Sequence, residues 1–206
     1  MDALISNTLV HTELPPKHRS TLFDNVKILH NGQREALDAV KEWGRNLQEN
    51  IRNRNDLVLV GPAGVGKDYL ASALLNQLTL KFRNARHHFR YIDGIDLRND
   101  LMEAKTSDFA SYPARIAHYA GYHLLYVSDP FPQKAQLSDF ERGAIFDVLE
   151  KRQHTGCNIF TCNATDYAQL CDQIGEANAS RIFDGATVVP CDWQSFRQPT
   201  LFVECN

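Results

Sequence analysis

The sequence lacks any apolar run that is long enough to cross a membrane. A spanning helix needs roughly 18 or more consecutive apolar residues, and no run within the 206 residues approaches that length. The first residues, Met1 to Leu4, also lack the basic segment and the following apolar stretch of a secretory leader. We therefore expect no membrane partner and a cytoplasmic protein.

Paired cysteines and a strong excess of one charge are also missing. The cysteines include no C-x-x-C pair, which leaves no zinc site of the usual spacing. Unpaired thiols in odd number are typical of a reducing compartment. The 22 basic and 25 acidic side chains give a net charge of −3, which argues against a protein that coats nucleic acid through bulk positive charge. A local basic surface remains compatible with this balance.

Strand and helix patterns alternate along most of the chain, after an irregular arm over residues 1–20. Short apolar runs predict strands at 56–60, 89–92, 124–127, 158–162 and 187–190. Helical spacing of apolar residues predicts helices at 31–48, with Asn31 as its N-cap, and at 67–80, 95–105, 114–120, 138–154 and 167–174. This alternation predicts an α/β fold with a mostly parallel, five-stranded sheet between helices.

A glycine-rich loop follows the first predicted strand and opens the second predicted helix. Residues 61–67 read GPAGVGK, which is the G-x-x-x-x-G-K motif in its strand–loop–helix setting. Glycines let successive N–H groups turn toward phosphate oxygens, and the helix N-terminus adds its positive end. The predicted nucleotide-binding residues are Gly61, Pro62, Ala63, Gly64, Val65, Gly66, Lys67, Asp68 and Tyr69.

One position of this motif departs from its usual chemistry. The residue after Lys67 is normally Ser or Thr, whose hydroxyl binds Mg²⁺, but Asp68 stands there. A carboxylate also binds Mg²⁺, yet it places a negative charge beside the phosphates. Two outcomes stay open: Asp68 takes the metal directly, or it weakens nucleotide binding.

The strand at 124–127 ends in a motif with a complementary departure. Four apolar residues should precede two acids, one for the metal and one for the attacking water, but Ser128 and Asp129 follow them. We hypothesise that Asp68 replaces the missing carboxylate, that Asp68 and Asp129 hold Mg²⁺, and that Asp129 polarises water. The alternative is a decayed site in which Asp129 only terminates the strand.

Taken together, these motifs resemble the AAA+ ATPases of the DnaC/IstB type, which are helicase loaders and transposition helper proteins. The resemblance extends from Phe23 to Arg197 and includes segments 70–74, 145–152, 158–163, 180–182 and 192–197. It implies a P-loop NTPase core of AAA+ type over residues 21–206, without a C-terminal lid domain.

The resemblance also implies two further catalytic residues beside Asp129. Asn163 matches the polar sensor that holds the attacking water, although an Asn at a strand end is also a common turn former. Arg181 matches the arginine finger that enters the site of a neighbouring subunit and stabilises the transferring phosphoryl group. The alternative for Arg181 is an ordinary surface arginine.

One strongly basic stretch interleaves cations with aromatic residues. Lys81, Arg83 and Arg86 lie in KFRNARHHFR, a pattern that single-strand binding surfaces share. Basic residues also stabilise a helix C-terminus through its dipole, so this stretch is a candidate contact for single-stranded DNA with a purely structural alternative.

Three functions follow from these observations. The first is an ATP-dependent switch or loader that acts on a DNA-bound partner, a replicative helicase or a transposase, in replication or transposition. It would form a nucleotide-dependent homo-oligomer and use ATP and Mg²⁺, with turnover in question because of Asp68 and Ser128. The second is a non-hydrolysing nucleotide-binding adaptor, and the third is a small P-loop kinase.

Overall fold

A single parallel sheet forms the centre of the molecule. The computed structural model describes residues 12–84, 88–107, 110–131, 137–164 and 166–197. Within them, every strand pairing is parallel and the strand order is β2-β3-β4-β1-β5. The strands are β1 (Leu57–Val60), β2 (Phe89–Asp93), β3 (Leu124–Ser128), β4 (Cys157–Cys162) and β5 (Thr187–Pro190). The α/β prediction is confirmed, and the sheet is parallel throughout.

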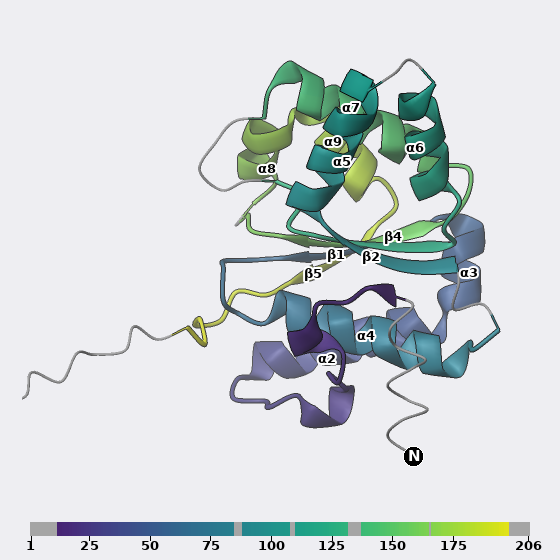
Figure 1. The fold of residues 1–206 in the computed structure, drawn as a ribbon. Coiled ribbons are helices and arrows are strands. Elements are labelled where there is room, and N and C mark those ends of the chain that lie inside the picture. Colours follow the sequence, from purple (N-terminus) through teal and green to yellow (C-terminus); the bar gives the residue numbers. More distant parts are fainter. Residues whose placement is uncertain (1–11, 85–87, 108–109, 132–136, 165, 198–206) are drawn as a thin grey trace, which may run out of the picture.

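Helices cover both faces of this sheet (Figure 1). One face carries α5 to α9, and the other carries α2 and α4. No helix within the described part of the chain has the length and apolar character needed to cross a membrane. The helices are α2 (Asn31–Arg45), α3 (Leu47–Asn53), α4 (Lys67–Lys81), α5 (Gly94–Ser107), α6 (Ser111–Ala120), α7 (Asp139–Arg152), α8 (Tyr167–Ile174), α9 (Glu176–Phe183) and the 3-10 turns η2 (Pro16–His18) and η3 (Phe23–Asn25).

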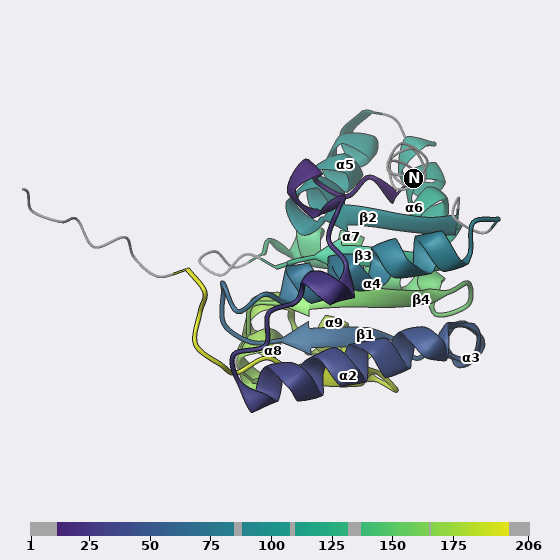
Figure 2. The same cartoon turned by 90° about the horizontal axis from the view of Figure 1, so that it is seen from below.

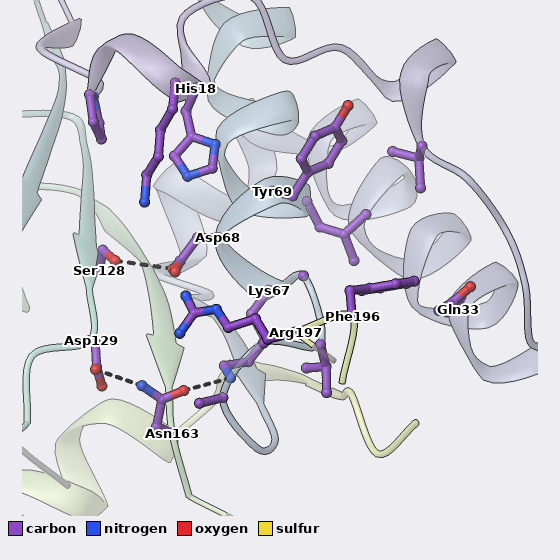
Figure 3. Close-up of a pocket in the computed structure, with 18 of the residues that line it drawn as sticks. His18, Gln33, Lys67, Asp68, Tyr69, Ser128, Asp129, Asn163, Phe196 and Arg197 are labelled. Atoms are coloured by element: carbon purple, nitrogen blue, oxygen red, sulfur yellow. Dashed lines mark hydrogen bonds between the residues drawn. The ribbon is translucent and has the colours of Figure 1, made fainter. Parts of the chain in front are cut away.

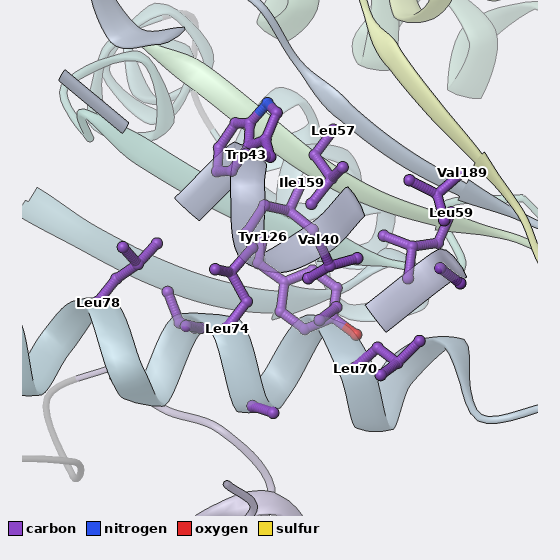
Figure 4. Close-up of a cluster of buried hydrophobic side chains, with 14 of the residues drawn as sticks. Val40, Trp43, Leu57, Leu59, Leu70, Leu74, Leu78, Tyr126, Ile159 and Val189 are labelled. Atoms are coloured by element: carbon purple, nitrogen blue, oxygen red, sulfur yellow. The ribbon is translucent and has the colours of Figure 1, made fainter. Parts of the chain in front are cut away.

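Alternating residues along each central strand feed two separate apolar cores. Leu57 and Leu59 of β1 join the cluster under α2 and α4, whereas Val58 joins the cluster under α5 to α9. In β3, Tyr126 points to the first cluster and Val127 to the second. Figure 4 shows the first cluster packed between the sheet and α4. Strands that are buried on both faces have continuous apolar sequences, so these strands could be predicted from the sequence.

Two details of the predicted helices are wrong. The helix expected over 31–48 ends at Arg45, and α3 begins at Leu47. The Asn50 side chain donates to the Trp43 carbonyl at 2.7 Å. This side-chain hydrogen bond satisfies a backbone acceptor at the break between the two helices. The N-cap of α2 is His30 rather than Asn31.

One helix escaped the sequence patterns altogether. The eight-residue α9 starts after Gly175, whose φ of +83° sharply redirects the chain from α8. Only three of its side chains are buried, and Ala179 and Ile182 are the apolar ones among them. A helix this short with so few apolar positions has no periodicity that distinguishes it from a loop.

The N-terminal segment from residue 12 onward packs against α4 (Figure 2). Leu14 is fully buried in the core under α2 and α4. The Asn76 side chain of α4 donates to the carbonyls of His18 and Thr21 at 2.9 and 2.8 Å. These contacts hold η2 against α4, and His18 at its end lines the same cavity as Asp68.

A buried polar network joins the opposite, amino-terminal edge of the sheet. Arg152 is 1% exposed, and its guanidinium donates to the Asn158 side chain and to three backbone carbonyls, those of Tyr119, Tyr122 and Cys157. Asp56 in turn accepts hydrogen bonds from the Asn158 backbone and side chain at 2.7 and 2.8 Å. Burial raises the pKa of Asp56 to about 6.

Candidate functional site

A cavity of about 690 Å³ opens at the carboxyl-terminal edge of the sheet. In open α/β sheets this edge is where ligands bind. Six parts of the chain meet there: η2, the segment around Val26, the first turn of α2, the motif loop with the start of α4, the ends of β2 to β4, and the C-terminal segment (Figure 3). The cavity therefore combines residues that lie far apart in the sequence.

The motif loop connects β1 to α4 as predicted, and its lysine is held inside the loop. The Lys67 ammonium donates to the Gly61 and Pro62 carbonyls at 2.7 and 2.8 Å and to Asn163 Oδ1 at 2.8 Å. Burial lowers the pKa of Lys67. All three partners are neutral oxygens, so anionic phosphate oxygens would replace them favourably.

The C-terminal segment lies directly on this loop. A Cβ at Gly61 would stand 2.0 Å from the Cys191 carbonyl oxygen, so only glycine permits the approach. The Trp193 indole N–H donates to the Val65 carbonyl at 2.8 Å, and the Phe196 backbone N–H donates to the Gly64 carbonyl at 2.9 Å. The loop is thus fixed from outside by residues that follow β5.

Asp68 sits in a cage of hydroxyl groups. Its Oδ1 atom accepts hydrogen bonds from Tyr126 and Ser128 of β3, both at 3.0 Å, and from Thr161 of β4 at 2.6 Å. Ser128 and Thr161 are register partners on adjacent strands. The carboxylate at position 68 and the hydroxyl at position 128 are therefore in direct contact, as the hypothesis of an exchange between them requires.

Asp129 and Asn163 continue the line of polar groups from Lys67. Asn163 Nδ2 donates to Asp129 Oδ2 at 2.6 Å while its Oδ1 receives the Lys67 ammonium. Asp129 Oδ1 is buried and has no hydrogen-bond partner among the described residues. Burial raises the pKa of Asp129, and the charge of Asp68 acts in the same direction.

The backbone at Asp129 is unusual and depends on a glycine. Asp129 has a φ of +45°, a left-handed conformation that Asp tolerates better than most residues. A Cβ at Gly94 would stand 2.2 Å from Pro130 Cα and 2.5 Å from the Asp129 carbonyl oxygen. The start of α5 thereby fixes the turn that aims Asp129 into the cavity.

Arg181 does not reach this cavity within one chain. It lies on α9, where its guanidinium pairs with Glu150 of α7 and lies 3.9 Å from the ring centroid of Phe146. Tyr69, by contrast, lines the cavity, and its hydroxyl contacts the Asn25 carbonyl at 3.4 Å. Of the predicted site residues, Arg181 is thus the one that the structure places on a distant surface.

The basic stretch lies at the other end of α4. Lys81 closes this 15-residue helix, about 20 Å from its start at the motif loop. The Lys81 ammonium lies 5.1 Å from the ring centroid of Phe82, and Arg83 is exposed. Arg86 lies outside the described residues. Any nucleic acid held there would be remote from the cavity.

Sequence reasoning overlooked several groups in the cavity. Tyr126, Thr161, His18 and Gln33 contact or line it, but none belongs to the loop motif. The polar pair formed by Thr161 and Ser128 was a usable signal, since both interrupt apolar strands at their carboxyl ends. Gln33 and His18 had no such signal, because only the folded chain brings them to the loop.

Known proteins share this combination of loop and sheet. A family model described as IstB-like ATP binding protein matches residues 37–200. The chain belongs to this family. The IstB-like proteins and the DnaC helicase loaders are AAA+ ATPases, so the AAA+ core predicted from the motifs is confirmed.

Individual relatives come from both branches of the family. The chain is 25% identical over 177 residues to the replicative helicase loader DnaC of Buchnera aphidicola subsp. Acyrthosiphon pisum, a match that covers 85% of this chain and 69% of the relative. It is 27% identical over 156 residues to the insertion sequence IS232 putative ATP-binding protein of Bacillus thuringiensis subsp. berliner. This match covers 71% of this chain and 57% of the relative.

Solved structures agree on the fold. The crystal structure of the DnaC helicase loader matches with a TM-score of 0.68 at 20% identity and covers 85% of this chain and 99% of that one. The crystal structure of DnaI matches with a TM-score of 0.69 at 18% identity and covers 89% and 94%. At these identities the likeness supports the AAA+ fold and carries no residue roles.

Proposed function

We propose that this family member is an ATP-dependent switch that acts on a DNA-bound partner protein. The observation that carries the proposal is the hydrogen-bonded line from Lys67 through Asn163 to Asp129, set across the motif loop and the ends of β3 and β4. The Lys67 ammonium and the Asp129 carboxylate thus lie on the two sides of the Asn163 amide, in a member of an ATP-binding family. This arrangement supports phosphate binding by the one and activation of water by the other.

Each residue of this line has a distinct task. Lys67 leaves its loop carbonyls and binds the β- and γ-phosphates, which are stronger acceptors. Asp129, whose pKa burial raises, takes a proton from the attacking water through its free Oδ1. Asn163 keeps both groups in place and orients that water.

The donor set also fits Mg²⁺, which we include in the proposal. The described residues contain no cluster of three or more His, Cys, Asp or Glu side chains able to hold a metal ion, but Mg²⁺ is usually bound through one or two carboxylates together with phosphates and water. Asp68 and Asp129 provide two such carboxylates. The hydroxyl bonds to Asp68 Oδ1 leave Oδ2 for the ion, which would neutralise charge on the phosphates.

Steady-state hydrolysis of ATP tests the proposal. Asp129→Asn removes the proton acceptor while keeping the shape of the side chain, so we expect turnover to fall about 10²- to 10⁴-fold with ATP still bound. Asp172→Asn makes the same chemical change on an exposed part of α8 and should hydrolyse ATP at the wild-type rate. Equal rates in wild type and Asp129→Asn would refute the role of Asp129.

One observation favours a second candidate, a nucleotide-binding adaptor without turnover. Three hydroxyl donors already engage Asp68 Oδ1, which ties this carboxylate to the sheet and limits its freedom to follow a metal ion during catalysis. This candidate predicts tight ATP binding by calorimetry with no phosphate release above background, and no effect of Asp129→Asn on either measurement.

The partner is a replicative helicase or a transposase. Support comes from the relatives of this chain, which include replicative helicase loaders and an insertion-sequence ATP-binding protein. Affinity capture of partners with ATP and with ADP, read by mass spectrometry, separates the two. Recovery of neither protein class under either nucleotide would count against the proposal.

Assembly of several copies would bring Arg181 to a neighbouring site. In one copy its guanidinium is paired with Glu150 and stacked on Phe146, so acting across an interface requires release from both. Arg181→Lys keeps the charge and loses the planar fork. We expect it to lower turnover more than tenfold while light scattering still shows ATP-dependent assembly, and unchanged turnover would exclude the finger role.

Single-stranded DNA would bind to the basic stretch at Lys81, Arg83 and Arg86. Modest charge on each copy adds up along a strand when several copies assemble. Affinity should therefore fall steeply with salt and should be lost when the three residues are changed together to Ala. DNA binding that is insensitive to both would place the contact elsewhere.

A further inference from the structure

Gln33 carries out two tasks with the two ends of one amide. It lies in the first turn of α2, where its Oε1 atom accepts hydrogen bonds from the Leu29 and His30 backbone N–H groups at 2.6 and 3.2 Å. Turning the amide over would set its NH₂ group against these two donors. The helix start therefore fixes the orientation of the side chain, with oxygen toward the backbone.

The nitrogen end of this amide has no partner. Gln33 is 4% exposed, and Nε2 is buried without a hydrogen bond to any residue that the structure describes. Its two N–H donors are fixed by the capping contact and cannot rotate to find acceptors elsewhere. A buried donor that lacks an acceptor destabilises the fold, so the nitrogen of Gln33 is a candidate contact for a ligand.

Gln33 lines the same cavity as the motif loop, on the side away from the acids. In Figure 3 Ser128 and Asp129 lie at one end, Lys67 and Arg197 in the middle, and Phe196 and Gln33 at the other end. Since Lys67 marks the position of the phosphates, a nucleotide that extends away from the acids brings its base to Gln33.

The surroundings of Gln33 match a planar base. Val26 and Leu70 add apolar side chains to the lining of the cavity. Phe196, which lies at the Gln33 end in Figure 3, is 49% exposed, so its ring can stack on a base. Lys27 and His18 also line the cavity. Gln33 differs from them in offering a buried amide N–H whose direction is fixed by the capping hydrogen bonds.

We propose that Gln33 Nε2 reads the base of the bound nucleotide by donating a hydrogen bond to a ring nitrogen of adenine. The proposal rests on the proposed function, since it names the group that recognises the base of ATP. Adenine carries unprotonated ring nitrogens at N1, N3 and N7, and each accepts a hydrogen bond in the plane of the ring. Gln33 can only donate to the base, because its oxygen is already used by the backbone. It can therefore bind a ring nitrogen but not the exocyclic amino group, which is itself a donor.

Gln33→Glu isolates this task from helix capping. Glutamate keeps the oxygen that accepts the Leu29 and His30 N–H groups but loses the NH₂ donors, so α2 should start as before and the melting temperature should stay within a few degrees of wild type. Calorimetry with ATP and with tripolyphosphate then separates base binding from phosphate binding. We expect ATP affinity to fall at least tenfold and tripolyphosphate affinity to change less than twofold.

Tripolyphosphate also controls for the added charge, because it carries the same anionic groups as the ATP tail. An equal loss of affinity for both ligands would mean that the substitution acts through charge or folding, which overturns the inference. Wild-type ATP affinity in Gln33→Glu also overturns it. Failure of the wild-type protein to bind either ligand would instead refute nucleotide binding itself.

Deaza analogues identify the acceptor. In 1-deaza-, 3-deaza- and 7-deaza-ATP one ring nitrogen is replaced by C–H, which cannot accept. We expect one analogue to bind wild type about tenfold more weakly than ATP, and this difference to vanish in Gln33→Leu. Equal affinity of wild type for ATP and all three analogues would exclude the proposed hydrogen bond.

Discussion

Because Asp68 and Ser128 are in contact, we predict that the carboxylate and the hydroxyl can be swapped between the two positions only together. We consider Asp68→Thr, Ser128→Asp and the variant with both changes. In Asp68→Thr the buried hydroxyls of Tyr126 and Thr161 lose the carboxylate that accepts from them. At about 1–3 kcal/mol for each unsatisfied buried group, the free energy of unfolding should fall by roughly 3 kcal/mol.

Ser128→Asp alone introduces the opposite fault. Ser128 Oγ lies 3.0 Å from Asp68 Oδ1, so an aspartate there brings two carboxylates within roughly 4 Å of each other. Their repulsion is about 4 kcal/mol at an effective dielectric constant near 20. The double variant has one carboxylate again, now on β3 and facing the new threonine hydroxyl, and its stability should lie within about 1.5 kcal/mol of wild type.

Urea denaturation followed by circular dichroism at neutral pH measures all four corners of this cycle. The losses in the two single variants and the recovery in the double variant give a coupling free energy of about 5 kcal/mol, above the usual range of about 0.5–3 kcal/mol for residues in contact. Asp172→Thr on the exposed face of α8 is the control and should change stability by less than about 0.5 kcal/mol. Additive single effects would refute the exchange, and ATP turnover restored in the double variant would extend it to function.

Three further predictions concern the scaffold. Arg152→Lys keeps the charge but has a single nitrogen for four acceptors, so urea denaturation should show a loss of about 2–4 kcal/mol, and a loss below 1 kcal/mol would contradict the network. Gly94→Ala forces backbone atoms apart at Asp129 and should lower both the melting temperature and ATP turnover. Gly143→Ala is the control, because its new Cβ meets open space, and it should stabilise α7 by about 0.5–1 kcal/mol. Equal effects of the two substitutions would contradict the close packing of Gly94 on Asp129 and Pro130. The pKa of Asp56, raised by burial from 3.8 to about 6, means that the folded state holds this proton more tightly than the unfolded state. Its stabilising contribution is therefore present below pH 4 and is lost as the pH rises to about 6. The loss is on the order of 3 kcal/mol, and the difference in unfolding free energy between wild type and Asp56→Asn should show it over that range; a pH-independent difference would refute it.

Much of the fold could be predicted because its strands are buried on both faces. Residues 57–60 and 124–128 are near-continuous apolar runs beside glycine or acid, and the loop between 60 and 67 has a composition that few other structures use. These motifs alone predict that Lys67 and Asp129 belong to one site, and both line the cavity. Their proximity follows from parallel pairing, which brings the carboxyl ends of the strands to one edge.

The rest of the site depends on contacts that the sequence does not encode locally. The cage around Asp68 needs Tyr126 and Thr161 from two strands, and which face of each strand a polar residue occupies is settled by the register. Gln33 reads as an ordinary residue of a helical first turn, and its free nitrogen is apparent only beside the loop. The Arg152 network likewise depends on distant parts of the chain, since Tyr119 lies 33 residues from Arg152 and Asp56 lies 102 residues from Asn158.

The indole of Trp193 gives the protein a built-in optical reporter. The chain has two tryptophans: Trp43 donates to the Asn55 carbonyl at the end of α2, away from the cavity, and Trp193 donates to Val65 within the phosphate loop. Any change in the curvature of that loop alters the environment of one fluorophore and leaves the other as it was. In Trp43→Phe, the remaining emission would follow loop motion in unlabelled protein, on the millisecond scale of a stopped-flow instrument.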